Sequence, residues 1–185
     1  MPSDASKPVT AVVCAAFDEA ADAHVLAVRG LARELGVTVA ETPAHRPHLT
    51  LSAARLPADD LPRLLDTVAE IAARHAPLPI RLSEVGQFAR TGVLWLGPER
   101  GKALPDLQRD VYKSLKRAGY PSAFAESAPY RWVPHCTLAT RIPRPLLRSV
   151  RESLIDDVPP FDATITGFAT ILVGGRGDVG YAALG

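Results

Sequence analysis

Two short patterns, one in each half of the chain, carry the residues with the clearest chemical meaning. The first is Pro47-His48-Leu49-Thr50-Leu51, and the second is Pro134-His135-Cys136-Thr137-Leu138. Their histidines lie close to half of the 185-residue chain apart, and each pattern leads from a predicted strand into an amphipathic helix. One His-x-Thr-Leu alone would be weak evidence. Two copies in matched contexts indicate the internal repetition of a whole supersecondary unit.

Strand geometry predicts how the side chains of each copy are arranged. Successive side chains of a strand point to opposite faces. The histidine and the threonine of one copy therefore share a face, and the residues that alternate with them take the other. The polar faces carry His48, Thr50, His135 and Thr137, and the apolar faces carry Leu49, Leu51, Cys136 and Leu138. If the two halves pack as pseudo-twofold lobes, two imidazoles and two hydroxyls converge in one cleft.

Two imidazoles and two hydroxyls suit displacement at phosphorus. This reaction needs a proton removed from the attacking oxygen and a proton delivered to the leaving oxygen. Histidine, with an ordinary pKa near 6.5, performs either task near neutrality. We therefore predict that His48 and His135 are the catalytic acid and base, in an order that the sequence leaves open. Thr50 and Thr137 are predicted to donate hydrogen bonds to the phosphate oxygens.

The elements around the two patterns follow from hydrophobic periodicity. Strands and helices are predicted in the order β-α-β-α-β-β-α-β-α-β-β, which indicates an α+β fold with helices on one face of largely antiparallel sheets. A loop is predicted over residues 120–132. Strands are predicted at residues 10–17, 48–55, 80–88, 92–96, 135–142, 162–173 and 178–184, and helices at 18–36, 59–75, 104–118 and 145–156.

Composition narrows the class of protein. The chain is 47% hydrophobic and 22% charged, enough to bury a core. Its formal net charge of +1 disfavours a protein that coats duplex DNA or RNA. Two cysteines support no disulfide scaffold. We predict a disordered tail at residues 1–8 and one bilobal domain at 9–185. No membrane-spanning run or signal peptide is recognised, so a cytoplasmic location is expected. We also expect a monomer.

The paired motifs resemble those of the 2H phosphoesterase superfamily, and most closely its bacterial 2'-5' RNA ligase-like and RNA 2',3'-cyclic phosphodiesterase proteins. Segments 92–97, 132–135 and 180–184 are also similar to this group. The resemblance implies a bilobal pseudo-twofold fold, in which two mainly antiparallel sheets face a central cleft and helices cover the outer faces. It also implies chemistry without a metal or other cofactor, on 2',3'-cyclic phosphates or 2'-5' linkages.

Only His48, Thr50, His135 and Thr137 match the motif of the resembled family. The second copy departs from the commonest pattern in its Cys136 and in the threonine that precedes Arg141. Arg141 shares strand parity with His135, and Arg46 shares it with His48, so both arginines are candidate phosphate ligands. Arg131 is a weaker candidate. A zinc site on the histidines and Cys136 is disfavoured, because Cys136 should point away from His135.

The predicted function is a metal-independent phosphoesterase that opens the 2',3'-cyclic phosphates of RNA ends or small nucleotides. Ligation through 2'-5' linkages is a candidate side activity of the same site. One alternative is a non-catalytic module that binds RNA or nucleotides in this cleft. Another is a phosphodiesterase for 2'-5' oligoadenylate or for a cyclic phosphate of ADP-ribose. The aromatic residues that could stack on a base are Phe17, Trp95, Tyr130, Trp132 and Tyr181.

Overall fold

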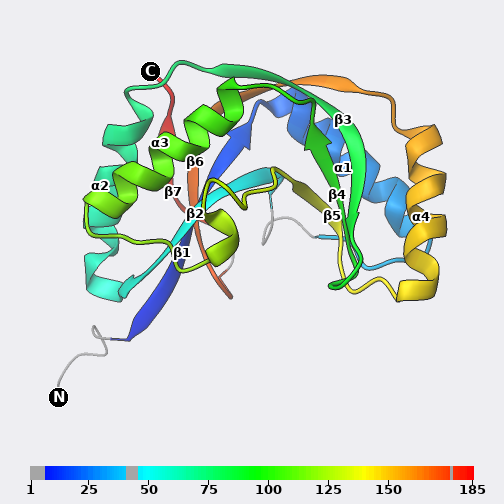
Figure 1. Ribbon diagram of the computed structural model, residues 1–185, viewed down its shortest axis with the longest axis horizontal. Helices are drawn as coiled ribbons and strands as arrows, with labels where there is room; N and C mark the ends of the chain where they lie inside the picture. The colour runs from blue at the N-terminus through cyan, green and yellow to red at the C-terminus, as the bar shows by residue number, and fades with distance from the viewer. Residues whose placement is uncertain (1–6, 41–45, 176) are drawn as a thin grey trace.

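The computed structural model describes residues 7–40, 46–175 and 177–185. Within them, the main strands and helices follow the predicted order (Figure 1). The strands are β1 (Pro8–Phe17), β2 (His48–Pro57), β3 (Leu78–Phe88), β4 (Val93–Pro98), β5 (Cys136–Ala139), β6 (Phe161–Leu172) and β7 (Asp178–Ala183). The helices are α1 (Glu19–Glu34), α2 (Leu61–Ala72), α3 (Ala103–Arg117) and α4 (Arg144–Asp157), with short 3-10 turns η2 (Ala58–Asp60) and η3 (Ala125–Ser127). Of the predicted tail, residues 1–6 lie outside the described residues, and Pro8 already belongs to β1.

All seven strands belong to one antiparallel sheet, where two sheets were predicted. The order is β2-β1-β6-β3-β4-β5, and β7 pairs with β6. The twelve-residue strand β6 is the reason for the continuity. Its first part, 161–165, pairs with β3, and its later part, 165–172, pairs with β1. A strand long enough to pair with both halves joins them into one hydrogen-bonded sheet.

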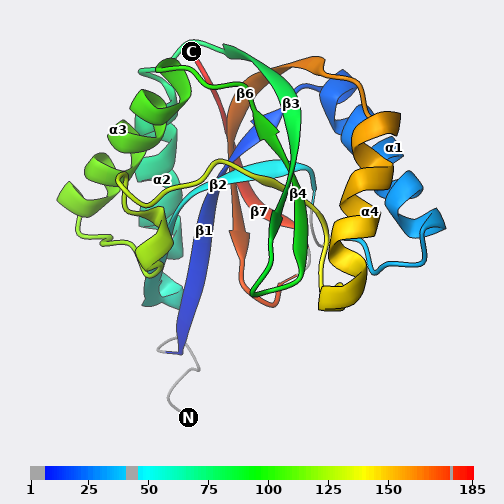
Figure 2. The ribbon, with the colours of Figure 1, turned by 45° about the vertical axis from the view of Figure 1, so that its right-hand side comes forward.

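The helices form two pairs at opposite ends of the molecule (Figure 2). Helices α2 and α3 contact each other, and they pack against β7 and β2, respectively. Helices α1 and α4 also contact each other, and they pack against β5 and β3, respectively. Each pair therefore supports one of the two strands that carry, or immediately follow, a predicted catalytic histidine.

The two motif strands, β2 and β5, occupy opposite ends of the sheet order and yet contact each other. Two interactions connect β2 to β5 and to the loop that precedes it. The Trp132 indole N–H donates to the Thr50 carbonyl over 2.8 Å. The backbone N–H of His48 hydrogen-bonds the Cys136 sulfur. The sheet thus curls until its two ends meet, which brings the two copies of the repeat together.

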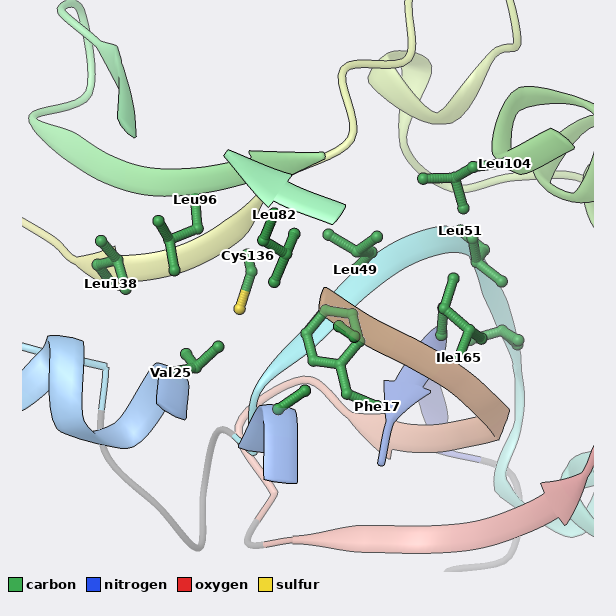
Figure 3. Close-up of a cluster of buried hydrophobic side chains, with 14 of the residues drawn as sticks. Phe17, Val25, Leu49, Leu51, Leu82, Leu96, Leu104, Cys136, Leu138 and Ile165 are labelled. Carbon is green, nitrogen blue, oxygen red and sulfur yellow. The ribbon is translucent and has the colours of Figure 1, made fainter. Parts of the chain in front are cut away.

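The apolar face of both motifs is buried in one hydrophobic core, as predicted. Leu49 and Leu51 of β2 are fully buried, and so are Cys136 and Leu138 of β5. Figure 3 shows these side chains gathered with residues of α1, β3, β4 and β6. The histidines and threonines that alternate with them are only half-buried. Burial of the apolar face prevents a one-residue slip, because a slip would turn the histidines into the core.

Helix α1 begins and ends where the sequence predicted. The Asp18 carboxylate accepts a hydrogen bond from the Ala21 N–H over 2.9 Å and caps the helix. Gly36 follows the C-terminus with a left-handed φ of 78°. Within the described residues, no helix combines the length and the apolar character that crossing a bilayer requires.

The second motif strand is shorter than predicted. The pattern predicted a strand over residues 135–142, but β5 ends at Ala139. Arg141 has a left-handed φ of 58°, which turns the chain out of the strand. Gly92 then approaches closely, and its carbonyl accepts a hydrogen bond from the Ile142 N–H over 2.9 Å. A Cβ on Gly92 would lie 2.5 Å from the Ile142 oxygen, so this contact requires glycine.

Candidate active site

His48 is the first residue of β2, and its ring is oriented by its own backbone. Its Nδ1 lies 2.7 Å from the carbonyl oxygen of Arg46, two residues earlier. A carbonyl can only accept a hydrogen bond, so Nδ1 carries the proton. In the neutral imidazole, Nε2 is then the basic nitrogen.

His135 directly precedes β5 and has the same arrangement. Its Nδ1 lies 2.8 Å from the carbonyl oxygen of Val133, again two residues earlier. Nδ1 therefore donates, and Nε2 is the basic nitrogen here too. In both copies the intervening residue is proline, whose restricted φ holds the carbonyl in place. The repeat thus reproduces an orientation of the imidazole as well as a residue pattern.

The surroundings of His135 are aromatic. Its ring stands edge-on to Phe88, with centroids 4.9 Å apart and planes at 85°. The Trp95 ring lies 6.4 Å away. Burial lowers the pKa of His135, and the hydrogen bond to Val133 opposes this shift without cancelling it. His135 is therefore neutral at a lower pH than an exposed histidine would be.

An open cleft of about 690 Å³ adjoins both copies of the repeat. Thr50 contributes from β2, and His135 contributes from the start of β5. The other walls are the β3–β4 turn and the loop from 124 to 133. The lining residues are Thr50, Gln87, Phe88, Ala89, Arg90, Thr91, Phe124, Glu126, Ser127, Arg131, Trp132, Val133 and His135.

Thr137 lies two residues beyond His135, on the same face of the strand. It is the cross-strand partner of Trp95 in β4, and its carbonyl accepts hydrogen bonds from the buried Arg29 side chain. In β2, the Thr50 hydroxyl hydrogen-bonds the Cys14 thiol of β1. Both threonines are half-buried beside their histidines, as strand parity predicted.

The two cysteines lie beneath these residues. Burial raises the pKa of Cys136 to about 11, and burial also raises the pKa of Cys14. Each thiol is therefore protonated at neutral pH, which makes it a poor nucleophile. Cys136 lies on the face opposite His135, as predicted. Among residues 7–40, 46–175 and 177–185, no three His, Cys, Asp or Glu side chains gather in a way that would hold a metal ion.

Arg46, a predicted phosphate ligand, is engaged elsewhere. Its guanidinium forms ion pairs with Asp22 over 3.1 Å and with Asp178 over 2.9 Å. It also lies 5.9 Å from the centroid of the Tyr181 ring. Two carboxylates already balance its charge. Arg46 lies close to His48 in the chain, and like His48 and Thr137 it is not among the residues that line the cleft.

Arg141, the other predicted phosphate ligand, has lost the strand parity on which its prediction rested. Because β5 ends at Ala139 and Arg141 has a left-handed backbone, the alternation from His135 does not reach it. Its side chain is exposed and lies outside the cleft wall. The argument from alternation was therefore wrong at this position.

The cleft contains charged and aromatic residues that the sequence underrated or missed. Arg131 and Arg90 both line it, although Arg131 was the weaker candidate and Arg90 was not singled out. Phe88 and Phe124 also line the cleft, although they were not predicted as site residues. Among the predicted aromatic residues, Trp132 lines the cleft, Trp95 lies behind His135, and Phe17 is in the core. The sequence offered one signal for residues 131 and 132, which is that they lie only a few positions before His135.

The family of the chain follows from comparison with known proteins. Residues 17–176 match the 2'-5' RNA ligase superfamily, and the chain belongs to this superfamily. An RNA 2',3'-cyclic phosphodiesterase from Geobacillus stearothermophilus is 31% identical over 98 residues, which make up 51% of this chain and 30% of that protein. The aligned part thus spans less than a third of that relative. The predicted resemblance is confirmed.

Solved structures confirm the α+β fold. Apo E. coli LigT aligns with a TM-score of 0.64 at 17% identity, over 97% of this chain and 99% of LigT. LigT complexed with 3'-AMP aligns with a TM-score of 0.64 at 16% identity, over 97% and 99%. The protein TT0787 of Thermus thermophilus aligns with a TM-score of 0.64 at 20% identity, over 95% and 97%. At these identities the likeness shows the fold alone.

Proposed function

We propose that the protein is a metal-independent phosphoesterase that opens 2',3'-cyclic phosphates of RNA ends or small nucleotides. The observation that carries the proposal is the matched orientation of two histidines. His48 and His135 each direct Nδ1 to a carbonyl two residues earlier, so Nε2 is the basic nitrogen of each ring and the one suited to proton transfer. The contacts between β2 and β5 support their action on one substrate.

The reaction needs no group beyond these residues and water. One Nε2 removes a proton from water as the water oxygen forms a bond to phosphorus. The bond from phosphorus to one ribose oxygen breaks, and the second Nε2 delivers a proton to that oxygen. The product is a 2'- or 3'-phosphomonoester. Thr50 and Thr137 donate hydrogen bonds to the non-bridging oxygens as charge develops on them.

His135 is the better suited of the two to act as the base. Phe88 and Trp95 pack against it, and its burial lowers its pKa, so the neutral form predominates near pH 7. A general base must be neutral before the reaction begins. We assign the acid to His48. Ligation through a 2'-5' linkage would use the same pair in the same roles: a ribose 5'-hydroxyl takes the place of water as the attacking group, and the 3'-oxygen leaves with the proton from the acid.

The comparisons support this substrate class. A relative in the same superfamily is named an RNA 2',3'-cyclic phosphodiesterase. LigT, whose fold this chain shares, has been crystallised with 3'-AMP, a nucleoside monophosphate of the kind that cyclic phosphate opening releases. The cleft of about 690 Å³ is large enough for one nucleotide.

The test is hydrolysis of 2',3'-cyclic AMP, and of a short RNA ending in a cyclic phosphate, in the presence of a chelator. We expect turnover with a bell-shaped dependence between about pH 5 and pH 9. His48→Ala and His135→Ala should each lower kcat roughly a hundred- to ten-thousandfold, with unchanged thermal melting. Full activity in the variant that lacks both histidines would refute the mechanism.

Two further assay arms separate the alternatives. Binding of 3'-AMP without turnover of any substrate would favour a nucleotide-binding module. Turnover of a 2'-5' linked oligoadenylate or of a cyclic phosphate of ADP-ribose, without turnover of the RNA, would keep the mechanism and change the substrate.

A further inference from the structure

The proposed reaction leaves one requirement unmet by the paired motifs. Charge develops on the non-bridging phosphate oxygens, where the threonine hydroxyls are neutral donors, and the proton of the acid histidine is directed to the leaving oxygen instead. Arginine meets this need well, because its planar guanidinium offers paired donors that match a phosphate. The structure decides which arginine is placed to do so.

Two arginines near the motifs are engaged elsewhere, and a third lies outside the cleft. Arg46 is ion-paired with two carboxylates. Arg29 is buried on α1 and donates to the Thr137 carbonyl, so it supports the backbone of β5. Arg141 lies beyond the end of β5, exposed and outside the cleft wall.

Arg131 differs from these three arginines in its position. Its side chain lines the cleft together with Thr50 and His135. Within the described part of the chain, its guanidinium makes no ion pair and no hydrogen bond to a side chain or carbonyl. Among the residues that line the cleft, the acidic one is Glu126, which is exposed and forms no ion pair within the described residues. The charge of Arg131 therefore remains to be matched by an anion.

The backbone that carries Arg131 is held firmly to both motifs. The N–H groups of Arg131 and Trp132 both donate to the Ala128 carbonyl, over 2.8 and 2.9 Å. The Trp132 indole donates to the Thr50 carbonyl, which ties this turn to β2. His135 lies three residues after Trp132. A shift of Arg131 away from the site would break these bonds.

We propose that Arg131 binds the phosphate of the substrate and adds a permanent positive charge beside the neutral hydroxyl donors of the two motifs. The proposal deepens the proposed function, since it concerns the same cleft. It also replaces Arg46 and Arg141 as the principal phosphate ligand. Arg90 also lines the cleft, from the β3–β4 turn, but the role is assigned to Arg131 because its neighbour Trp132 is hydrogen-bonded to Thr50 of the first motif.

The test compares two probes that differ only in the phosphate: 3'-AMP and adenosine, titrated by calorimetry. We expect Arg131→Ala to weaken 3'-AMP binding roughly ten- to a hundredfold, the range for loss of charged hydrogen bonds. Adenosine binding should not change. Arg131→Lys should recover part of the loss, because it restores the charge but not the paired donors. Arg148→Ala, an exposed arginine on α4, is the matched control and should bind both probes normally.

The outcomes distinguish this proposal from the proposed function. Weaker binding of both probes by Arg131→Ala would indicate a packing role and overturn the proposal. So would a selective loss of 3'-AMP binding in Arg141→Ala with none in Arg131→Ala. A further outcome is that the wild-type protein hydrolyses no cyclic phosphate while the Arg131→Ala variant selectively loses affinity for 3'-AMP. In that case the proposed function fails and Arg131 remains the phosphate ligand. If the wild-type protein hydrolyses cyclic phosphates and Arg131→Ala binds both probes as Arg148→Ala does, the proposed function stands and the role of Arg131 is refuted.

Discussion

His48 and His135 each donate the same kind of hydrogen bond from Nδ1, but they have very different neighbours. The residue whose carbonyl orients His48 is Arg46, which is fixed by the carboxylates of Asp22 and Asp178. The residue that packs against His135 is Phe88, with Trp95 behind it. One copy of the repeat is therefore embedded in ion pairs and the other in aromatic rings.

This contrast teaches that a repeated motif can determine the orientation of a side chain without determining its protonation. Orientation comes from the backbone two residues earlier, which the repeat carries with it. Protonation depends on desolvation and nearby charge, which come from other elements. An internal repeat can in this way provide an acid and a base from the same four residues.

The largest difference between the two histidines is expected when the leaving oxygen of the substrate is replaced by sulfur. In a 2',3'-cyclic phosphate with a bridging sulfur, the leaving thiolate needs no proton, because a thiol is far more acidic than an alcohol. We expect His48→Ala to lose roughly a hundred- to ten-thousandfold in kcat on the oxygen substrate and to recover most of it on the sulfur substrate. The measurement is single-turnover kinetics.

His135→Ala is the control for this exchange. If His135 is the base, its loss is equally severe on both substrates. Recovery by His135→Ala and not by His48→Ala would reverse the assignment of the roles.

Removing the two hydroxyls tests whether the copies contribute equally to phosphate binding. Thr50→Val and Thr137→Val keep the shape of the side chain and remove the donor. We expect each to lower kcat roughly a hundredfold, the scale of one lost donor to a developing negative charge. Serine at either position should retain most of the rate. An unchanged kcat in one valine variant would restrict the phosphate contact to the other copy.

The aromatic side of the comparison is tested by the pH profile. Phe88→Ala admits water to His135, which relieves the desolvation that lowers its pKa. The base is active when neutral, so activity falls as the pH drops through this pKa. The acidic limb of kcat/KM should therefore lie below the ordinary histidine value in the wild type and move to higher pH in the variant.

Phe124→Ala is the matched control, because Phe124 lines the same cleft from another wall. It should alter KM and leave the acidic limb in place. A limb that does not move in Phe88→Ala would contradict the assignment of His135 as the base.

The smallest effect is expected at the ion-paired side. Asp178→Asn removes one of the two charges that hold Arg46, and both side chains of this pair remain about a quarter exposed. Such pairs stabilise a fold by about 0–1 kcal/mol, so unfolding in urea should shift only slightly. A gain of phosphate affinity in this variant would show that the released Arg46 can reach the phosphate, and would restore it as a candidate ligand.

Much of the local structure follows from the sequence, because it depends on neighbours along the chain. The order of strands and helices, the cap at Asp18 and the glycine after α1 are of this kind. So is the alternation that buries Leu49 and Leu138 and leaves the histidines half-buried, since strand geometry and hydrophobicity suffice for it. The errors lie where distant segments compete. Arg141 leaves its strand because Gly92, from another hairpin, holds the next residue.

The sequence by itself determined that two His-x-Thr units exist and which side of each strand is polar. The tertiary structure was needed to show that one long strand, β6, joins the halves into a single sheet, and that the two ends of this sheet meet. It also decided that Arg46 is neutralised by two carboxylates and that Arg131 lines the cleft. The physical reason is that pairing between distant strands and desolvation by packed rings depend on residues far apart in the chain. A pattern of neighbouring residues does not predict such contacts.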